Sequence, residues 1–189
     1  MGALVRELIV DIDDETRRLA YAVIASRMAL TQLKDRADER KETHPMSNLD
    51  VARKALHALA AGDVITLNSL VTDDFQFAGI TPQPLGKQEF LEFSQAIHAA
   101  FPDFAFHETT SSENGDTVTI KHTITGIHTG TLNAPGLPPI PATGKPIALP
   151  EETSVYTLKD GKVVRMQAYP APDGGLTGIL KQLGVQLPG

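Results

Sequence analysis

The sequence predicts an α+β domain in which helices come first and antiparallel strands follow. Apolar residues recur at helical spacing in the first half of the chain, whereas the second half alternates between apolar and polar residues, as in strands. The dipeptides Asn114-Gly115 and Asp160-Gly161 each separate two such alternating runs and are strong hairpin signals. Helices followed by hairpins indicate an α+β architecture with one main sheet.

Residues 1–45 differ in pattern from the rest and are predicted to form one long helical extension. From Asp13 to Glu42 they contain many helix formers and no Gly or Pro, and Pro45 discourages further helix. Leu19, Val23 and Leu30 fall near one helical face, which would need a partner. In an alternative interpretation, this segment does not belong to the native protein and the domain starts at Met46.

The predicted domain covers residues 46–189 and opens with helices. Ser47 and Asp50 have the spacing of a capping box, which marks a helix start. The elements expected next are a helix over 47–61, a short helix over 63–71, a short strand over 74–79 and a helix over 86–101.

The remaining elements are four strands and a closing helix. The strands are expected over 104–112, 117–128, 146–158 and 162–169, and the helix over 174–184, where Gly184 suits the C-terminal cap. The segment 131–145 between the second and third strands is too rich in Pro and Gly for regular structure.

Composition excludes several classes of function. The net charge of −6 and the lack of a basic stretch argue against a nucleic-acid partner. Cysteine is absent, no apolar run reaches the length of a membrane span, and the six histidines show no metal-ligand spacing. No phosphate-binding loop is present. We therefore expect a cytoplasmic protein with no metal, no cofactor and no membrane partner.

Six short segments carry a resemblance to a known family. They are "AAFPDF" (99–104), "NGDTV" (114–118), "GIHTG" (126–130), "PATGKPI" (141–147), "DGKVV" (160–164) and "LKQLG" (180–184). In this order and spacing, over about residues 47–184, the chain resembles the SnoaL-like polyketide cyclase or ester cyclase family of the nuclear transport factor 2-like (cystatin-like) superfamily.

The resemblance implies a cone in which a curved, mainly antiparallel sheet wraps a helix-lined pocket. It also implies a homodimer formed through the outer face of the sheet. Family members include cofactor-independent cyclases, and the superfamily includes isomerases, hydrolases and proteins without catalysis, so the fold does not fix the function. Two hypotheses stay open: acid/base chemistry on a small, largely apolar molecule, or a non-catalytic ligand-binding or dimerisation module.

The family pattern places a catalytic aspartate near the end of the last strand. Counting from Gly161 reaches Ala171, and counting back from "QLG" reaches Gly175, so neither count finds an acid. The nearest acid is Asp173, which is our candidate catalytic carboxylate. "PDGG" is also an ordinary turn sequence, and the turn interpretation is the stronger one.

Two histidines are further candidates because of strand parity. Val118, Ile120, His122 and Ile124 share one face of the strand over 117–128, and this apolar face should line the cone. His122 is therefore a candidate catalytic and pocket residue, although a hydrogen-bonded core histidine is the commoner case. His128 continues this parity at the start of the loop, where it could lie at the pocket rim or bond to loop backbone.

The last two strands offer three more pocket candidates. Glu151 and Glu152 alternate, so one of them should face inward, and a buried glutamate beside His122 would make an acid/base pair. We take Glu151 as the pocket candidate, against the alternative of a solvated strand end. Family register favours Gln167 and Tyr169 as pocket residues on the last strand.

Overall fold

The computed structural model describes residues 15, 23–31, 46–133 and 138–185, and the chain divides into two units, Met1–Pro45 and Met46–Gly189. In the first unit the described residues are helical, and Val23 and Leu30 are exposed. The rest of the predicted extension, including Leu19, lies outside the described residues. Whether it belongs to the native protein stays an open alternative.

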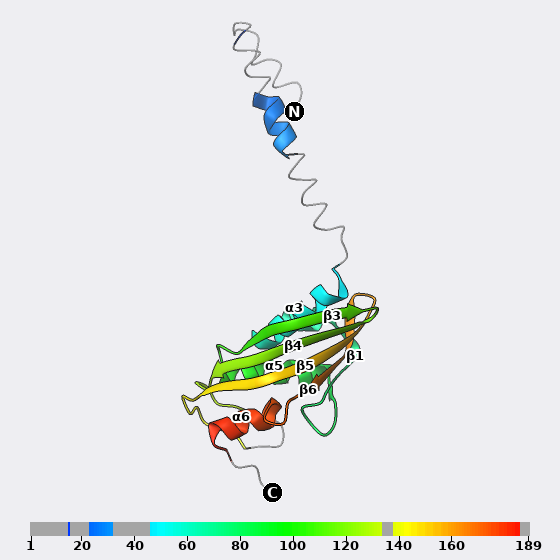
Figure 1. The fold of residues 1–189 in the computed structure, drawn as a ribbon. Helices are drawn as coiled ribbons and strands as arrows, with labels where there is room; N and C mark the ends of the chain where they lie inside the picture. The colour runs from blue at the N-terminus through cyan, green and yellow to red at the C-terminus, as the bar shows by residue number, and fades with distance from the viewer. Residues whose placement is uncertain (1–14, 16–22, 32–45, 134–137, 186–189) are drawn as a thin grey trace. The chain divides into compact units, whose positions relative to one another are not determined.

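The second unit has the α+β architecture that the sequence predicts (Figure 1). Its helices and strands are, in order, α3 (Asn48–Ala60), α4 (Val64–Leu70), β1 (Val71–Ala78), β2 (Leu85–Gly86), α5 (Lys87–Ala100), β3 (Ala105–Asn114), β4 (Thr117–Ile127), β5 (Pro146–Lys159), β6 (Lys162–Tyr169) and α6 (Gly175–Leu183). Two details differ from expectation: β1 already begins at Val71, because Val71 pairs with Val163 of β6, and the short β2 was not predicted.

The strands form one six-stranded sheet in the order β2-β1-β6-β5-β4-β3. All neighbours are antiparallel except β1 and β6, which are parallel. Figure 1 shows the long strands β3 to β6 curving together, with α3 and α5 behind them and α6 beside the start of β5. The predicted curved, mainly antiparallel sheet with helices on one face is confirmed.

Local chemistry starts and ends these elements as the sequence indicates. The Ser47 hydroxyl accepts a hydrogen bond from the backbone N–H of Asp50 at 3.1 Å and caps α3. The β5–β6 hairpin turns through Asp160 and Gly161, which both have positive φ (50° and 73°), as a two-residue turn of this kind requires. Within the predicted loop, Leu132 and Ile140 form one isolated bridge.

Two apolar clusters fill the space between helices and sheet. One lies among α3, α4, α5 and the strands, and it includes Phe75, Phe90 and Tyr156. The other joins the end of α5 to β4, β5 and α6, and it includes Phe101 and Leu180. The candidate site lies where these two clusters meet.

Candidate functional site

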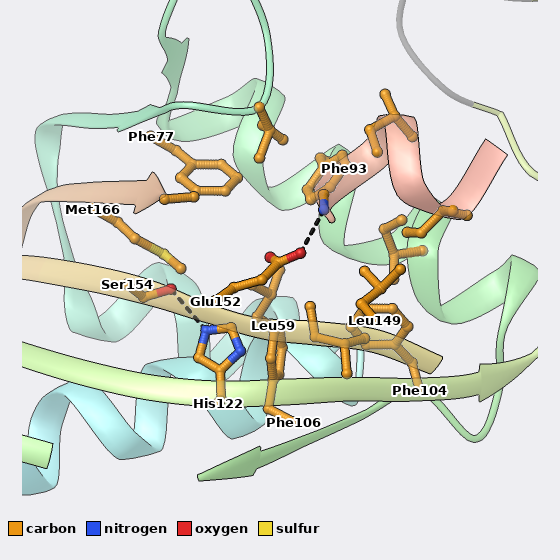
Figure 2. Close-up of a pocket in the computed structure, with 17 residues that line it drawn as sticks. Leu59, Phe77, Phe93, Phe104, Phe106, His122, Leu149, Glu152, Ser154 and Met166 are labelled. Carbon is orange, nitrogen blue, oxygen red and sulfur yellow. Dashed lines mark hydrogen bonds between the residues drawn. The ribbon is translucent and has the colours of Figure 1, made fainter. Parts of the chain in front are cut away.

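An apolar cavity lies between the concave face of the sheet and the helices α3, α5 and α6 (Figure 2). Its volume is about 60 Å³, counted as the space open to the centre of a water-sized sphere. Much of its wall is aromatic and comes from Phe77, Phe93, Phe104 and Phe106. The polar side chains that line it are His122 of β4 and Glu152 and Ser154 of β5. An apolar hollow with few convergent polar groups is typical of a small-molecule site.

A bulge in β5 brings both Leu149 and Glu152 to the cavity. Opposite them, His122 pairs with Glu152 and Ile124 pairs with Leu149, so three steps along β5 match two steps along β4. One extra residue in a strand reverses the alternation beyond it. Leu149 and Glu152 are therefore both buried, whereas Glu151 between them is exposed.

His122 is buried in the cavity wall, with 2% of its surface exposed. Its Nε2 lies 3.0 Å from Ser154 Oγ, and its ring packs edge-on against Phe106 with centroids 4.8 Å apart. Its Nδ1 has no hydrogen-bond partner among the described residues. Burial lowers the pKa of His122 to about 4, and the charge of Glu151 opposes this only in part, so the ring is neutral at pH 7.

Glu152 brings a buried carboxylate into the same cavity, with 6% of the residue exposed. Figure 2 shows its carboxylate reaching into the cavity, toward the backbone nitrogen at the start of α6. Its Oε1 accepts a hydrogen bond from the backbone N–H of Gly175, the first residue of α6. Burial raises the pKa of Glu152, and the bond from Gly175 opposes this rise. A raised pKa brings a carboxyl group closer to the pH range in which it can both take and give a proton.

The turn before α6 is shaped to receive this carboxylate. Gly174, the N-cap residue, has no side chain to cap the helix, so Glu152 does this from the neighbouring strand. A Cβ on Gly174 would lie 2.2 Å from Glu152 Oε1. Gly175 has φ +57°, which L residues rarely adopt. The two glycines therefore let the helix N-terminus approach Glu152.

The other end of α6 is also held by the segment around β5. Lys145 Nζ donates to the carbonyl of Leu183 at 2.7 Å, a cation at a helix C-terminus. Gln182 forms two hydrogen bonds with the backbone of Ala148, at 2.8 and 2.9 Å. Since α6 supplies Leu176 and other cavity residues, these bonds fix one wall of the cavity.

Of the two predicted catalytic residues, the structure places only His122 in the cavity. Asp173 lies at the surface with 70% of its side chain exposed and pairs with Lys181 at 2.7 Å. This ion pair lowers the pKa of Asp173, so its carboxyl group is ionised at neutral pH. Its position fits the turn interpretation of "PDGG".

The inward glutamate is Glu152 and not Glu151, which corrects the predicted position. Glu151 is directed outward with 48% of its side chain exposed, and it accepts a hydrogen bond from Thr109 Oγ1 at 2.6 Å. If inward residues alternate forward from Leu149, Glu151 should face the cavity. If they alternate back from Ser154, Glu152 should face it. The sequence signal for the bulge that makes the second count correct is Pro150, because proline inside a sheet is confined to edges, strand starts and bulges.

Gln167 and Tyr169 do not line the cavity either. Tyr169 is 57% exposed, and Gln167 is half-buried beside Arg165, whose guanidinium donates to it at 3.1 Å. The inward residues of β6 are Met166 and Ala168, which have the opposite parity.

His128 is fully buried, but among loop residues rather than in the cavity wall. Its backbone N–H donates to Lys145 O, and its carbonyl accepts from Gly144, both at 2.9 Å. Its Nδ1 lies 3.1 Å from Thr143 Oγ1. This geometry favours the interpretation that His128 bonds to the loop.

The described residues contain neither a metal-binding cluster nor a membrane-spanning helix. Among them, no group of three or more His, Asp or Glu side chains could hold a metal ion. Within the same ranges, no helix is long and apolar enough to cross a bilayer.

Solved structures with this fold come from several bacteria. A candidate SnoaL-like polyketide cyclase from Jannaschia sp. CCS1 aligns with a TM-score of 0.61 and 16% identity, over 74% of this chain and 93% of that one. The candidate polyketide cyclase IdmH from Streptomyces antibioticus aligns with a TM-score of 0.57 and 23% identity, over 74% of this chain and 100% of that one. The candidate hydroxylase AclR from Streptomyces galilaeus aligns with a TM-score of 0.60 and 17% identity, over 77% of this chain and 87% of that one. At these identities the likeness shows the fold alone.

Sequence comparison gives the family. No curated protein sequence matches the chain significantly. The family model of the SnoaL-like domain matches residues 52–166, which is more than half of the chain and runs from within α3 to within β6. The protein therefore belongs to the SnoaL-like domain family.

Proposed function

We propose that the cavity binds a small, largely apolar organic molecule and that Glu152 transfers protons to and from it. The reaction would need no cofactor and would be a polyketide or ester cyclisation, an isomerisation or a dehydration. One observation carries this proposal: a carboxyl group with a raised pKa reaches into an apolar cavity. Such a group suits general acid/base catalysis, because its pKa lies nearer the operating pH.

The surroundings of Glu152 support this role. His122, its cross-strand neighbour, is neutral and can hydrogen-bond a ligand without adding charge. None of the described residues that line the cavity is Lys or Arg, so no cation there holds Glu152 in its ionised form. The start of α6 contributes one hydrogen bond to the ionised form, from the N–H of Gly175.

The family pattern adds a second line of support. It places the catalytic acid near the end of the last strand, and one of the two counts falls on Gly175. In this chain a glycine stands there, and its N–H binds the carboxylate of Glu152. We infer that a carboxylate is kept close to the family position, although a different strand supplies it.

A proton-exchange assay tests this function without knowledge of the natural substrate. Cyclohexanone, a small enolisable ketone, would be incubated with the protein in D₂O, and loss of its α-hydrogens would be followed by NMR. Since a positioned acid/base group contributes about 10²–10⁴-fold, we expect Glu152→Gln to lower the protein-dependent rate at least tenfold. Full exchange by Glu152→Gln would overturn the assignment.

Glu151→Gln is the matched control, because it makes the same glutamate-to-glutamine change at the neighbouring position of β5. Glu151 lies outside the cavity, so its variant should exchange cyclohexanone at the wild-type rate. An equal loss in both variants would point to altered folding or to an effect of charge in general.

The second candidate function is a ligand-binding module without catalysis. It is favoured by the position of Asp173 at the surface and by the lack, among the described residues, of a hydrogen bond between Glu152 and His122. This module would bind cyclohexanone and give no Glu152-dependent exchange, so the same assay separates the two functions.

The homodimer through the outer face of the sheet and the cytoplasmic location stay predictions. The outer face carries half-buried β-branched residues such as Thr123, Thr153 and Val155, which suit packing against a second copy. Sedimentation of the purified protein, alone and with Val155→Lys, would test the dimer. A monomer at all concentrations would contradict it.

A further inference from the structure

The cavity is small compared with the spaces in which proteins hold ring-shaped molecules. A buried space needs about 10–15 Å³ for one water molecule when volume is counted in this way, and an engineered cavity of about 150 Å³ holds a benzene ring. At about 60 Å³, the cavity has room for roughly four to six water-sized groups. A single six-membered ring would therefore fill it and reach its mouth.

The buried part of the wall leaves no room for a second ring. It includes Leu149, Met166 and Ile179, which are all fully buried. Met166 belongs to one apolar cluster, and Leu149 and Ile179 belong to the other. Because protein interiors are close-packed, these side chains cannot move apart without disturbing the core.

The aromatic part of the wall is closed by contacts between rings. Phe104 packs edge-on against Phe106 with centroids 5.3 Å apart, and Phe106 packs in the same way against His122. Phe77 and Phe93 have their centroids 5.9 Å apart. These contacts hold the half-buried phenylalanines in place, so this side does not widen easily.

Three half-buried apolar side chains mark the mouth of the cavity on the side of Glu152. They are Ile80 of the loop after β1, Ala168 of β6 and Leu176 of α6. Leu176 directly follows Gly175, whose backbone N–H binds the Glu152 carboxylate. A ligand that reaches the carboxylate and extends through the mouth must therefore pass Leu176.

Ile80 is held at the mouth by the glycine before it. Gly79 has φ +99°, and a Cβ on it would lie 2.0 Å from the carbonyl oxygen of Ala168. The chain passes this close to β6 because the residue has no side chain. Ala168 pairs in turn with Ser154 of the cavity wall. Ile80 and Leu176 thus narrow the mouth from two different elements.

Charge restricts the ligand as well as size. An anionic group in the cavity would lie near Glu152, and none of the described lining residues is a Lys or Arg that could offset it. Burial already raises the pKa of Glu152, which shows that even one negative charge is disfavoured there.

We propose that the cavity takes an organic molecule that has no anionic group and is no larger than one six-membered ring, and that Leu176 and Ile80 set this size limit. The ligand class rests on the proposed function, since it assumes that the cavity is the binding site. Leu176 and Ile80 are specificity-determining residues in this proposal, and molecules of two fused rings are excluded.

The test of size compares cyclohexanone with 1-decalone, which has the same ketone on two fused rings and four more carbons. Binding to the full-length protein would be followed by NMR through the amide signal of Gly175, at the cavity wall. If space were not limiting, burial of four more carbons would strengthen binding by about two orders of magnitude. We expect instead that the wild type binds 1-decalone no more tightly than cyclohexanone.

The test of charge compares 3-methyl-2-butanone with isobutyrate. The two molecules have the same shape and the same number of non-hydrogen atoms, and a methyl group of the ketone replaces one carboxylate oxygen. Because like charges placed side by side are strongly disfavoured, we expect the ketone to bind at least about tenfold more tightly than the acid at pH 7.

Variants at the mouth test which residues set the size limit. We expect Leu176→Ala and Ile80→Ala each to bind 1-decalone at least about tenfold more tightly than the wild type does, with less than about threefold change for cyclohexanone. Leu91→Ala is the matched control, because Leu91 is a half-buried residue of α5 that does not line the cavity. It should leave the binding of both ketones unchanged.

Each outcome decides a different claim. Tighter binding of 1-decalone than of cyclohexanone by the wild type overturns the size limit, and equal binding of isobutyrate and 3-methyl-2-butanone overturns the charge limit; in both cases the cavity remains a binding site. If neither mouth variant gains affinity for 1-decalone, Leu176 and Ile80 do not set the limit. If no probe binds, the proposed function fails, and the ligand class fails with it.

Discussion

Replacing Gly174 with alanine tests the contact between Glu152 and the start of α6. Gly174 has φ −108° and ψ −168°, an extended backbone that alanine adopts without strain, so space is the main obstacle. The new Cβ would lie 2.2 Å from Glu152 Oε1 and 3.0 Å from the backbone N of Ala171. Ordinary contacts begin at 3.4 Å, so the carboxylate or the helix end must move by about 1.2 Å.

This movement breaks or weakens the hydrogen bond from Gly175 to Glu152. Hydrogen bonds to charged groups contribute about 1.5–3 kcal/mol, and overpacking costs about 1–3 kcal/mol. The two effects share one cause, so we expect Gly174→Ala to lower the free energy of unfolding by about 2–3 kcal/mol. For a chain of this size the Tm should fall by roughly 5–10 °C.

A double-mutant cycle in urea isolates the contact. Glu152→Ala removes the carboxylate, so Gly174→Ala should then cost less than about 1 kcal/mol, which gives a coupling energy of at least about 1 kcal/mol. Gly86→Ala is the control, because Gly86 has φ −73° and its nearest atom to a new Cβ is 3.7 Å away. Additive effects within about 0.5 kcal/mol would refute the placement of Glu152 against α6.

Three further predictions follow from the charges. Asp173→Asn should leave stability and cyclohexanone exchange nearly unchanged, because its pair with Lys181 is exposed; a tenfold loss of exchange would restore Asp173 as the catalytic residue. Burial lowers the pKa of His122 to about 4, whereas the unfolded chain binds this proton near pH 6.5. The free energy of unfolding of the wild type should therefore fall by up to about 3 kcal/mol as the pH falls from 6.5 to 4. In urea titrations at pH 4.5 and 7, His122→Gln should lose less unfolding free energy between the two pH values than the wild type. An equal loss in both proteins would contradict the lowered pKa of His122. Arg53 holds the pKa of Glu108 at about 2 by a hydrogen bond, so Arg53→Gln should raise that pKa toward 4.5 in an NMR titration; an unchanged Glu108 titration would show that the pair does not form in solution.

The family resemblance predicted a carboxylate close to where the structure has one, but not the residue that supplies it. One family count points to Gly175, and the carboxylate found beside it belongs to Glu152, 23 residues earlier in the chain. A count along one segment cannot detect a side chain from a neighbouring strand. The signal that was available was the pair Glu151 and Glu152 opposite His122.

Features that depend on local chemistry could be predicted from the sequence alone. Ser47 caps the first helix of the domain, Asp160-Gly161 forms a hairpin turn, and the alternation along β4 turns His122 to the concave face. Each of these follows from residues close together in the chain, because backbone preferences and the two-residue period of a strand act locally.

Which polar groups meet in the cavity depends on long-range packing, which the sequence pattern does not show. The bulge in β5 turns Glu152 inward, the opposite parity of β6 turns Tyr169 outward, and the start of α6 approaches Glu152 because Gly174 leaves room for it. Asp173, although close in sequence to the family position, lies at the surface beside Lys181. These outcomes depend on the register between strands and on how α6 docks, and both are set by contacts between residues far apart in the chain.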